Sequence, residues 1–126
     1  MNLAQYFGNT KGVGILATAN SEGKIDLAVY TSPEVIDDNT IAFNMLERLS
    51  YKNLQTNPHA AYMFVEEGLK WSGKRFYLTK ISEKSGLERI RELRSMNMPL
   101  PDVAQTTKQF VCFKVENIRP IVGEDN

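Results

Sequence analysis

The sequence predicts a mainly β fold of the α+β class, in which about six antiparallel strands form a small barrel with short flanking helices. Runs rich in β-branched and aromatic residues recur along the chain, turn-forming residues separate most of them, and helical patterns are few and short. Strands joined by hairpins favour an antiparallel sheet over a parallel one. Closure into a barrel would remove most exposed strand edges.

The first two strands form the clearest hairpin. Val13 to Ala19 and Ile25 to Ser32 flank a run of turn residues, so they should pair antiparallel. Successive strand side chains point to opposite faces of a sheet. The second strand therefore has one apolar face, which we expect to belong to the core, and one mixed face. The apolar face is formed by Ile25, Leu27, Val29 and Thr31.

Four further strands follow. Pro33 lacks an N–H and interrupts the ladder, and Val35-Ile36 resumes it briefly. The turn over 37–39 then leads into Thr40 to Asn44, which makes a second hairpin. The remaining strands are expected at Thr40 to Asn44, Ala60 to Val65, Lys74 to Ile81 and Gln109 to Ile118.

Three short helices should accompany the strands. The chain opens with apolar residues at helical spacing, and Gly8-Asn9 provides a C-terminal stop. Ser50 could cap a second helix that runs through Thr56. Ser85 and Glu88 form a capping box for the third helix. Its apolar stripe consists of Leu87, Ile90 and Leu93.

Composition limits the function classes. The 126 residues fit one domain spanning 1–126. Fifteen basic and 15 acidic residues cancel, so no overall charge favours nucleic acid or a membrane surface, and no apolar run is long enough to span a bilayer. Cys112 is the only cysteine, which excludes an intramolecular disulfide and fits a reducing compartment. Without a leader pattern at the start, we expect a soluble protein of the cytoplasm.

The usual catalytic signatures are missing. The sequence has no GxSxG, Walker, HExxH or GxGxxG motif, and Gly12-Val13-Gly14 is not followed by the rest of a dinucleotide fingerprint. His59 is the sole histidine, so neither a site with several imidazoles nor a histidine-relayed nucleophile is expected. We interpret His59 as a loop residue after Pro58 and predict no metal.

The segment 44–58 is more informative. The start of its predicted helix presents free backbone N–H groups, and Arg48, Ser50 and Lys52 could add charge-assisted hydrogen bonds to a phosphate. This pattern predicts a local anion site. The alternative is an ordinary solvated helix start with surface charges.

The most specific pattern in the chain is Arg48-x-Ser50-x-Lys52-Asn53-Leu54-x-x-Asn57-Pro58. With it, residues 13–118 resemble the FMN-binding split-barrel family related to pyridoxamine 5′-phosphate oxidase. The resemblance implies a six-stranded antiparallel split β-barrel. It also implies that Arg48, Ser50 and Lys52 hold the FMN phosphate, while Asn53-Leu54 and Asn57-Pro58 structure the helix and start the next strand.

The same resemblance implies where the flavin ring lies. Family members place the isoalloxazine along the second strand, and the ring or ribityl chain passes the end of the strand before the anion site. The implied contacts are Ala28, Val29, Tyr30, Thr31 and Ser32, followed by Asn44 and Met45. Alternatively, Tyr30 packs on a barrel face and Thr31 and Ser32 are ordinary polar residues at a strand end.

Family members are usually homodimers with FMN at the subunit interface. The resemblance therefore implies that Trp71 and Lys74 reach the site of the partner chain, where Trp71 is suited to cover a flat ring. The chain is much shorter than pyridoxamine phosphate oxidases and ends without their carboxy-terminal substrate segment, so oxidation of vitamin B6 is not expected.

These expectations describe an FMN-dependent oxidoreductase of unknown substrate. A reduced nicotinamide or a partner protein would supply electrons to the flavin. Two alternatives stay open: a non-enzymatic flavin or haem binder that carries electrons, and a dimeric interaction module without cofactor. A deazaflavin in place of FMN also stays open.

Overall fold

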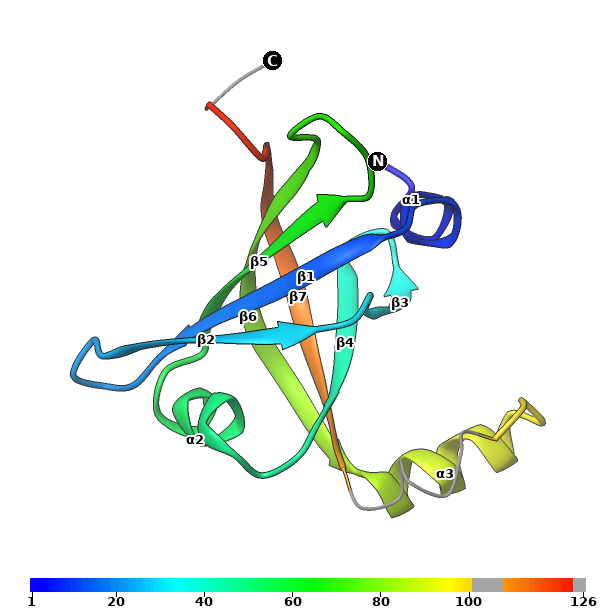
Figure 1. Cartoon of the computed structure of the whole chain (residues 1–126). Coiled ribbons are helices and arrows are strands. Elements are labelled where there is room, and N and C mark those ends of the chain that lie inside the picture. Colours follow the sequence, from blue (N-terminus) through cyan, green and yellow to red (C-terminus); the bar gives the residue numbers. More distant parts are fainter. Residues whose placement is uncertain (101–107, 124–126) are drawn as a thin grey trace.

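The computed structural model describes residues 1–100 and 108–123 (Figure 1). Its helices are α1 (Leu3–Asn9), α2 (Leu49–Thr56) and α3 (Gly86–Ser95). Its strands are β1 (Gly12–Ala19), β2 (Ile25–Tyr30), β3 (Glu34–Asp37), β4 (Thr40–Met45), β5 (His59–Glu66), β6 (Gly73–Ser85) and β7 (Gln109–Pro120). No helix in these two ranges is long and apolar enough to cross a membrane.

All the strands form one antiparallel sheet in the order β2-β1-β5-β6-β7-β4-β3. The mainly β prediction is confirmed, but the sheet has seven strands rather than six. The additional strand is β3, because Glu34 and Val35 pair with β4 as a ladder of their own after the break at Pro33. Among the described residues the sheet is open, so neither β2 nor β3 has a further strand paired to its outer edge and the expected closure does not remove these edges.

The core lies between the two ends of the curled sheet. In Figure 1, β1 and β2 cross in front of β4 and β7. Aromatic side chains connect these two parts of the sheet. The ring of Phe43 on β4 and the ring of Tyr62 on β5, the neighbour of β1, have centroids 4.9 Å apart. Phe64, Phe76 and Phe113 are also fully buried in the same cluster. Burial of these large rings supplies much of the apolar area that stabilises a chain of this length.

The apolar side of β2 lies on the outside of the sheet, so the prediction that it belongs to the core is wrong. Ile25, Leu27 and Val29 are 76%, 67% and 73% exposed. The side chains of β2 alternate as predicted, but β2 lies at the edge of the sheet, and its mixed side is the one that faces inward. Val29 pairs with Ile15, which pairs in turn with Met63. We call the resulting patch the outer apolar face, formed by Val13, Ile15, Ala17, Ile25, Leu27, Val29, Ala61 and Met63.

The third helix follows the sequence prediction closely. Ser85 is the N-cap of α3, and its hydroxyl accepts a hydrogen bond from the N–H of Glu88 at 3.2 Å. Leu93 of the predicted stripe is buried, whereas Leu87 is 58% exposed. In Figure 1, α3 lies at the end of the long β6 strand, apart from α2.

Candidate functional site

A cavity of about 540 Å³ lies where the edge strand β2, the end of β4 and the start of α2 meet. Its volume is in the range typical of small-molecule sites. Seven of the residues predicted for the site line it: Ala28, Val29, Tyr30, Thr31, Asn44, Arg48 and Ser50. The rest of the wall consists of Asp26, Leu27, Leu46, Leu49 and Lys108.

The β2 side of the cavity is an edge of the sheet. Consecutive residues Asp26–Thr31 line it, although their side chains alternate between the two faces of the strand. The cavity must therefore run along the free edge of β2 rather than against one face. A strand edge of this kind carries backbone N–H and C=O groups with no partner strand.

The α2 side of the cavity is the helix N-terminus. Arg48 is the N-cap and makes no side-chain capping bond. Ser50 was predicted to cap this helix, and that prediction is wrong. The helix begins at Leu49, so Ser50 lies within its first turn and is only 5% exposed. The first N–H groups of a helix have no partner inside the helix, and together they attract anions.

A buried hydrogen bond fixes α2 against the sheet. The side-chain amide of Asn53 donates to the hydroxyl of Thr18 on β1 at 3.0 Å, and both residues are almost fully buried. Leu54 packs in the core beside it. After the helix, the Asn57 side chain accepts a hydrogen bond from the N–H of His59, the first residue of β5. Asn53 and Asn57 therefore build the helix and do not line the cavity.

Tyr30 joins the two sides of the cavity. Its ring packs edge-on against Phe43 with centroids 5.6 Å apart. Burial raises the pKa of Tyr30, and the charge of Asp26 adds to the rise. The neighbouring Ser50 hydroxyl and the charge of Arg48 oppose this rise in the pKa. The phenol stays neutral at physiological pH and is available as a hydrogen-bond donor.

Three other predicted residues lie outside the cavity wall. Met45 follows Asn44 but points to the opposite side of β4, where it is fully buried in the core. Ser32 is exposed just beyond the end of β2, and Lys52 is exposed on α2. Neither of these two is among the residues that line the cavity.

Trp71 and Lys74 lie far from the cavity within the chain. They line a separate hollow of about 350 Å³ beside the connection between β5 and β6. Figure 1 shows that connection at the opposite end of the sheet from α2. Trp71 is 80% exposed there, and the Lys74 ammonium lies 5.6 Å from the centre of the Tyr6 ring.

Lys108 is the cavity residue that sequence reasoning missed most clearly. It precedes β7, whose first residue, Gln109, pairs with Met45 at the end of β4. This pairing joins strands that are distant in sequence, and no local pattern around Lys108 indicates it. Within the ranges that the structure describes, no group of three His, Cys, Asp or Glu residues could hold a metal.

Comparison of the sequence with protein-family models and with curated proteins finds no match. Several solved structures, however, share the fold over most of the chain. A candidate pyridoxamine 5′-phosphate oxidase from Lactobacillus delbrueckii aligns with a TM-score of 0.70 and 14% identity, covering 92% of this chain and 88% of that one. An FMN-binding protein from Syntrophomonas wolfei aligns with a TM-score of 0.69 and 20% identity, covering 93% and 82%.

A third structure, a FAD-binding protein from Mesorhizobium loti, aligns with a TM-score of 0.58 and 15% identity, covering 91% of this chain and 88% of that one. At such low identity, these similarities concern the path of the backbone. The chain has the split-barrel fold of the proteins related to pyridoxamine 5′-phosphate oxidase.

Proposed function

We propose that this protein binds a flavin, specifically FMN, in the cavity between β2, β4 and α2. The observation that supports this most strongly is the combination in one cavity of an uncapped helix N-terminus and a free strand edge. The first suits a phosphate, and the second suits the polar edge of a planar ring. FMN carries both groups at its two ends.

The phosphate would lie at the start of α2. There the backbone N–H groups of the first turn, the Arg48 guanidinium and the Ser50 hydroxyl can all donate to its oxygens. The attachment of α2 to β1 through Asn53 and Thr18 holds these donors in place before any ligand arrives. Such preorganisation reduces the entropy lost on binding.

The ring would lie along the free edge of β2. Backbone groups of the strand can bond the ring edge, and the hydroxyls of Tyr30 and Thr31 lie in the same wall. Leu46 and Leu49 provide apolar surface between the two ends. When bound, the flavin supplies the redox chemistry, and these residues bind and orient it.

We further propose that the protein is an oxidoreductase that receives electrons from a reduced nicotinamide or from a partner protein, and that it works in the cytoplasm. The buried, unpaired Cys112 fits a reducing compartment. Anaerobic addition of NADH or NADPH to the FMN-loaded protein should bleach the flavin band at about 450 nm. A band unchanged by these reductants and by candidate protein donors would favour a non-enzymatic flavin binder.

The outer apolar face supports a homodimer. Its exposed Ile25, Leu27 and Val29 continue in register into β1 and β5, and a contiguous apolar surface of this kind is typical of an interface. Trp71 and Lys74 do not reach the cavity of their own chain. In a dimer that places the flavin at the interface, Trp71 and Lys74 of a second copy would approach the flavin.

The experiment for the proposed function is a visible spectrum of the purified protein after incubation with FMN and passage through a desalting column. Retention of one FMN per chain, with bands at about 370 and 450 nm, is the expected result. Riboflavin lacks the phosphate and should be lost from the same column. A protein that retains neither compound would contradict the proposal and favour an interaction module without cofactor.

A further inference from the structure

Tyr62 reaches from the core to the end of the strand that borders the cavity. It lies on β5, which is separated from β2 by β1 in the sheet. Its side chain is fully buried, and its hydroxyl lies 3.1 Å from the carbonyl oxygens of both Tyr30 and Thr31. Because β5 and β2 are not neighbours, no backbone ladder joins them. The phenol provides this cross-sheet connection instead.

The connection ends where the β-ladder ends. The pairing of β1 with β2 stops at Gly14 and Tyr30, so the carbonyl of Thr31 lies beyond it. A carbonyl beyond the end of a ladder has no partner strand, and a buried phenol also needs a hydrogen-bond partner. Tyr62 meets both needs at the point where the chain leaves the sheet toward Pro33.

Gly14 makes room for this contact. It lies on β1, between Tyr30 on one side and Phe64 on the other. A Cβ at this position would overlap the Tyr62 hydroxyl and the carbonyl oxygen of Tyr30. Any larger residue would therefore push the phenol away from β2 or separate the strands. The position of the Tyr62 hydroxyl therefore requires a glycine at position 14.

The two carbonyls belong to residues of the cavity wall, since Tyr30 and Thr31 both line it. Burial raises the pKa of Tyr62 well above its usual range, so the phenol remains a neutral donor. We propose that Tyr62, admitted by Gly14, is a positioning residue that fixes the end of β2 so that its edge meets the flavin ring. This inference rests on the proposed flavin site.

The test replaces Tyr62 by Phe, which keeps the buried ring and removes only the hydroxyl. Titration with FMN and with riboflavin should show both dissociation constants raised by about three- to tenfold, the usual effect of one lost neutral hydrogen bond. The ratio of the two constants should stay at the wild-type value, because the phosphate donors on α2 are unchanged. A disturbed phosphate site would change that ratio.

Tyr6→Phe is the matched control. The Tyr6 hydroxyl donates to Glu66 at 2.7 Å, so this variant also loses a part-buried phenol hydrogen bond, but one far from the cavity. It should bind FMN and riboflavin as the wild type does. Equal weakening in the two variants, or unchanged affinity in Tyr62→Phe, would overturn the positioning role. A wild-type protein that retains no flavin would instead contradict the proposed function, and the positioning role with it.

A second measurement does not require flavin. Hydrogen exchange of the ligand-free protein should be faster over residues 28–32 in Tyr62→Phe than in the wild type, with no such change in Tyr6→Phe. Unchanged exchange in this segment would show that the phenol does not hold the end of β2, and would overturn the proposal. The measurement also applies to a variant that is only partly folded, because exchange is resolved along the chain.

Discussion

Asn53 on α2 and Thr18 on β1 are joined by a hydrogen bond of 3.0 Å in which both side chains are almost fully buried. The bond determines where the N-terminus of α2 lies, and therefore where Arg48 and Ser50 meet the cavity.

Replacing Asn53 by Ala should destabilise the protein by about 1–3 kcal/mol, because the Thr18 hydroxyl is left buried without its partner. Urea unfolding followed by circular dichroism measures this change. Lys52→Ala, one residue earlier on the exposed side of α2, is the control and should change stability by less than about 0.5 kcal/mol. Equal stability of the two variants would contradict a stabilising role for the bond.

Gly14→Ala should be severely destabilising, by at least about 2 kcal/mol, because the new methyl group overlaps Tyr62 and the backbone of β2. Gly8→Ala is the matched control. A Cβ on Gly8 in α1 meets nothing within 4 Å, and alanine favours a helix, so this change should be neutral or slightly stabilising. Thermal unfolding curves compare the two. Similar midpoints would contradict this steric overlap and mean that β1 and β2 separate easily at Gly14.

Stability should also fall at alkaline pH. The pKa of Tyr62 is raised in the folded state above its ordinary value of 10.0. Below pH 10 the phenol is protonated in both states, so its contribution is constant. Above pH 10 only the unfolded state loses the proton readily, which stabilises that state. The free energy of unfolding should therefore decline above about pH 10, and Tyr62→Phe should decline less steeply. Identical slopes for the two proteins would contradict the raised pKa.

Lys108→Ala should weaken FMN binding several-fold, with a weaker dependence on salt, because its charge lies in the same cavity wall as Arg48. Lys52→Ala should have less than about a twofold effect, since exposed charges outside the cavity are screened by solvent. Fluorescence titration of FMN at two salt concentrations distinguishes them. A larger effect of Lys52 would place the phosphate further along α2 than the cavity indicates.

Ile25→Lys should dissociate the proposed dimer, because it introduces a charge into the outer apolar face without touching the cavity wall. A stable dimer needs about 800 Å² of buried surface on each chain, so a charge within that surface is disruptive. Leu87→Lys on α3, where the leucine is also exposed, is the control. Light scattering after size-exclusion chromatography reports the mass. A wild-type monomer, or an unchanged Ile25→Lys dimer, would contradict this interface.

The sequence was most informative where the signals are local. The hairpin turn after Ala19 and the Ser85 cap of α3 were both predicted, because a few neighbouring residues determine each feature. Alternation along β2 also correctly grouped its side chains. It could not show which group points outward, because that depends on β1 and β5 continuing the same apolar surface.

Features that depend on distant pairing were missed for the same reason. Lys108 joins the cavity because β7 pairs with β4, from which it is distant in sequence. The hairpin of β3 with β4, by contrast, was predicted from the local turn over 37–39. The resemblance to the split-barrel family gathered Tyr30, Thr31 and Arg48 into one predicted site, and the structure places these three in one cavity. The same resemblance included Met45. Side chains alternate along β4, so Met45 points into the core, to the opposite side from Asn44.

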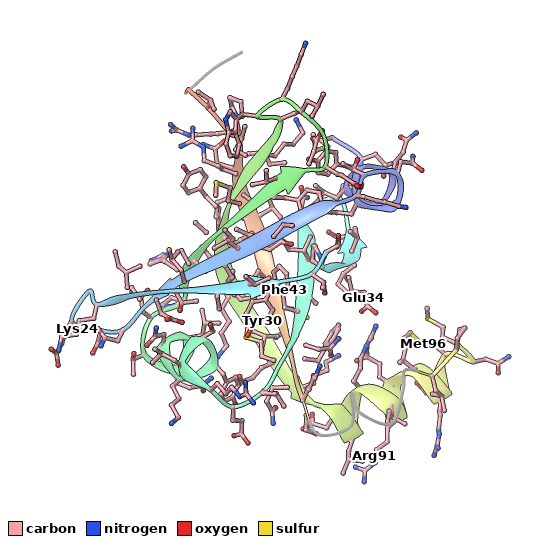
Figure 2. The ribbon with its side chains drawn as sticks, viewed as in Figure 1. Lys24, Tyr30, Glu34, Phe43, Arg91 and Met96 are labelled. Atoms are coloured by element: carbon pink, nitrogen blue, oxygen red, sulfur yellow. The ribbon has the colours of Figure 1, made fainter. Side chains whose placement is uncertain are left out.

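The most direct test of the flavin site is calorimetric titration of FMN into the wild type, Arg48→Ala and Arg91→Ala. Figure 2 labels Arg91 on α3, well apart from Tyr30, so it controls for the loss of one positive charge. We predict that Arg48→Ala weakens FMN binding by about ten- to a hundredfold, as expected for a lost charge-assisted hydrogen bond, and leaves riboflavin binding unchanged. Arg91→Ala should bind as the wild type does. Equal FMN affinities for all three proteins would contradict a phosphate site at the start of α2.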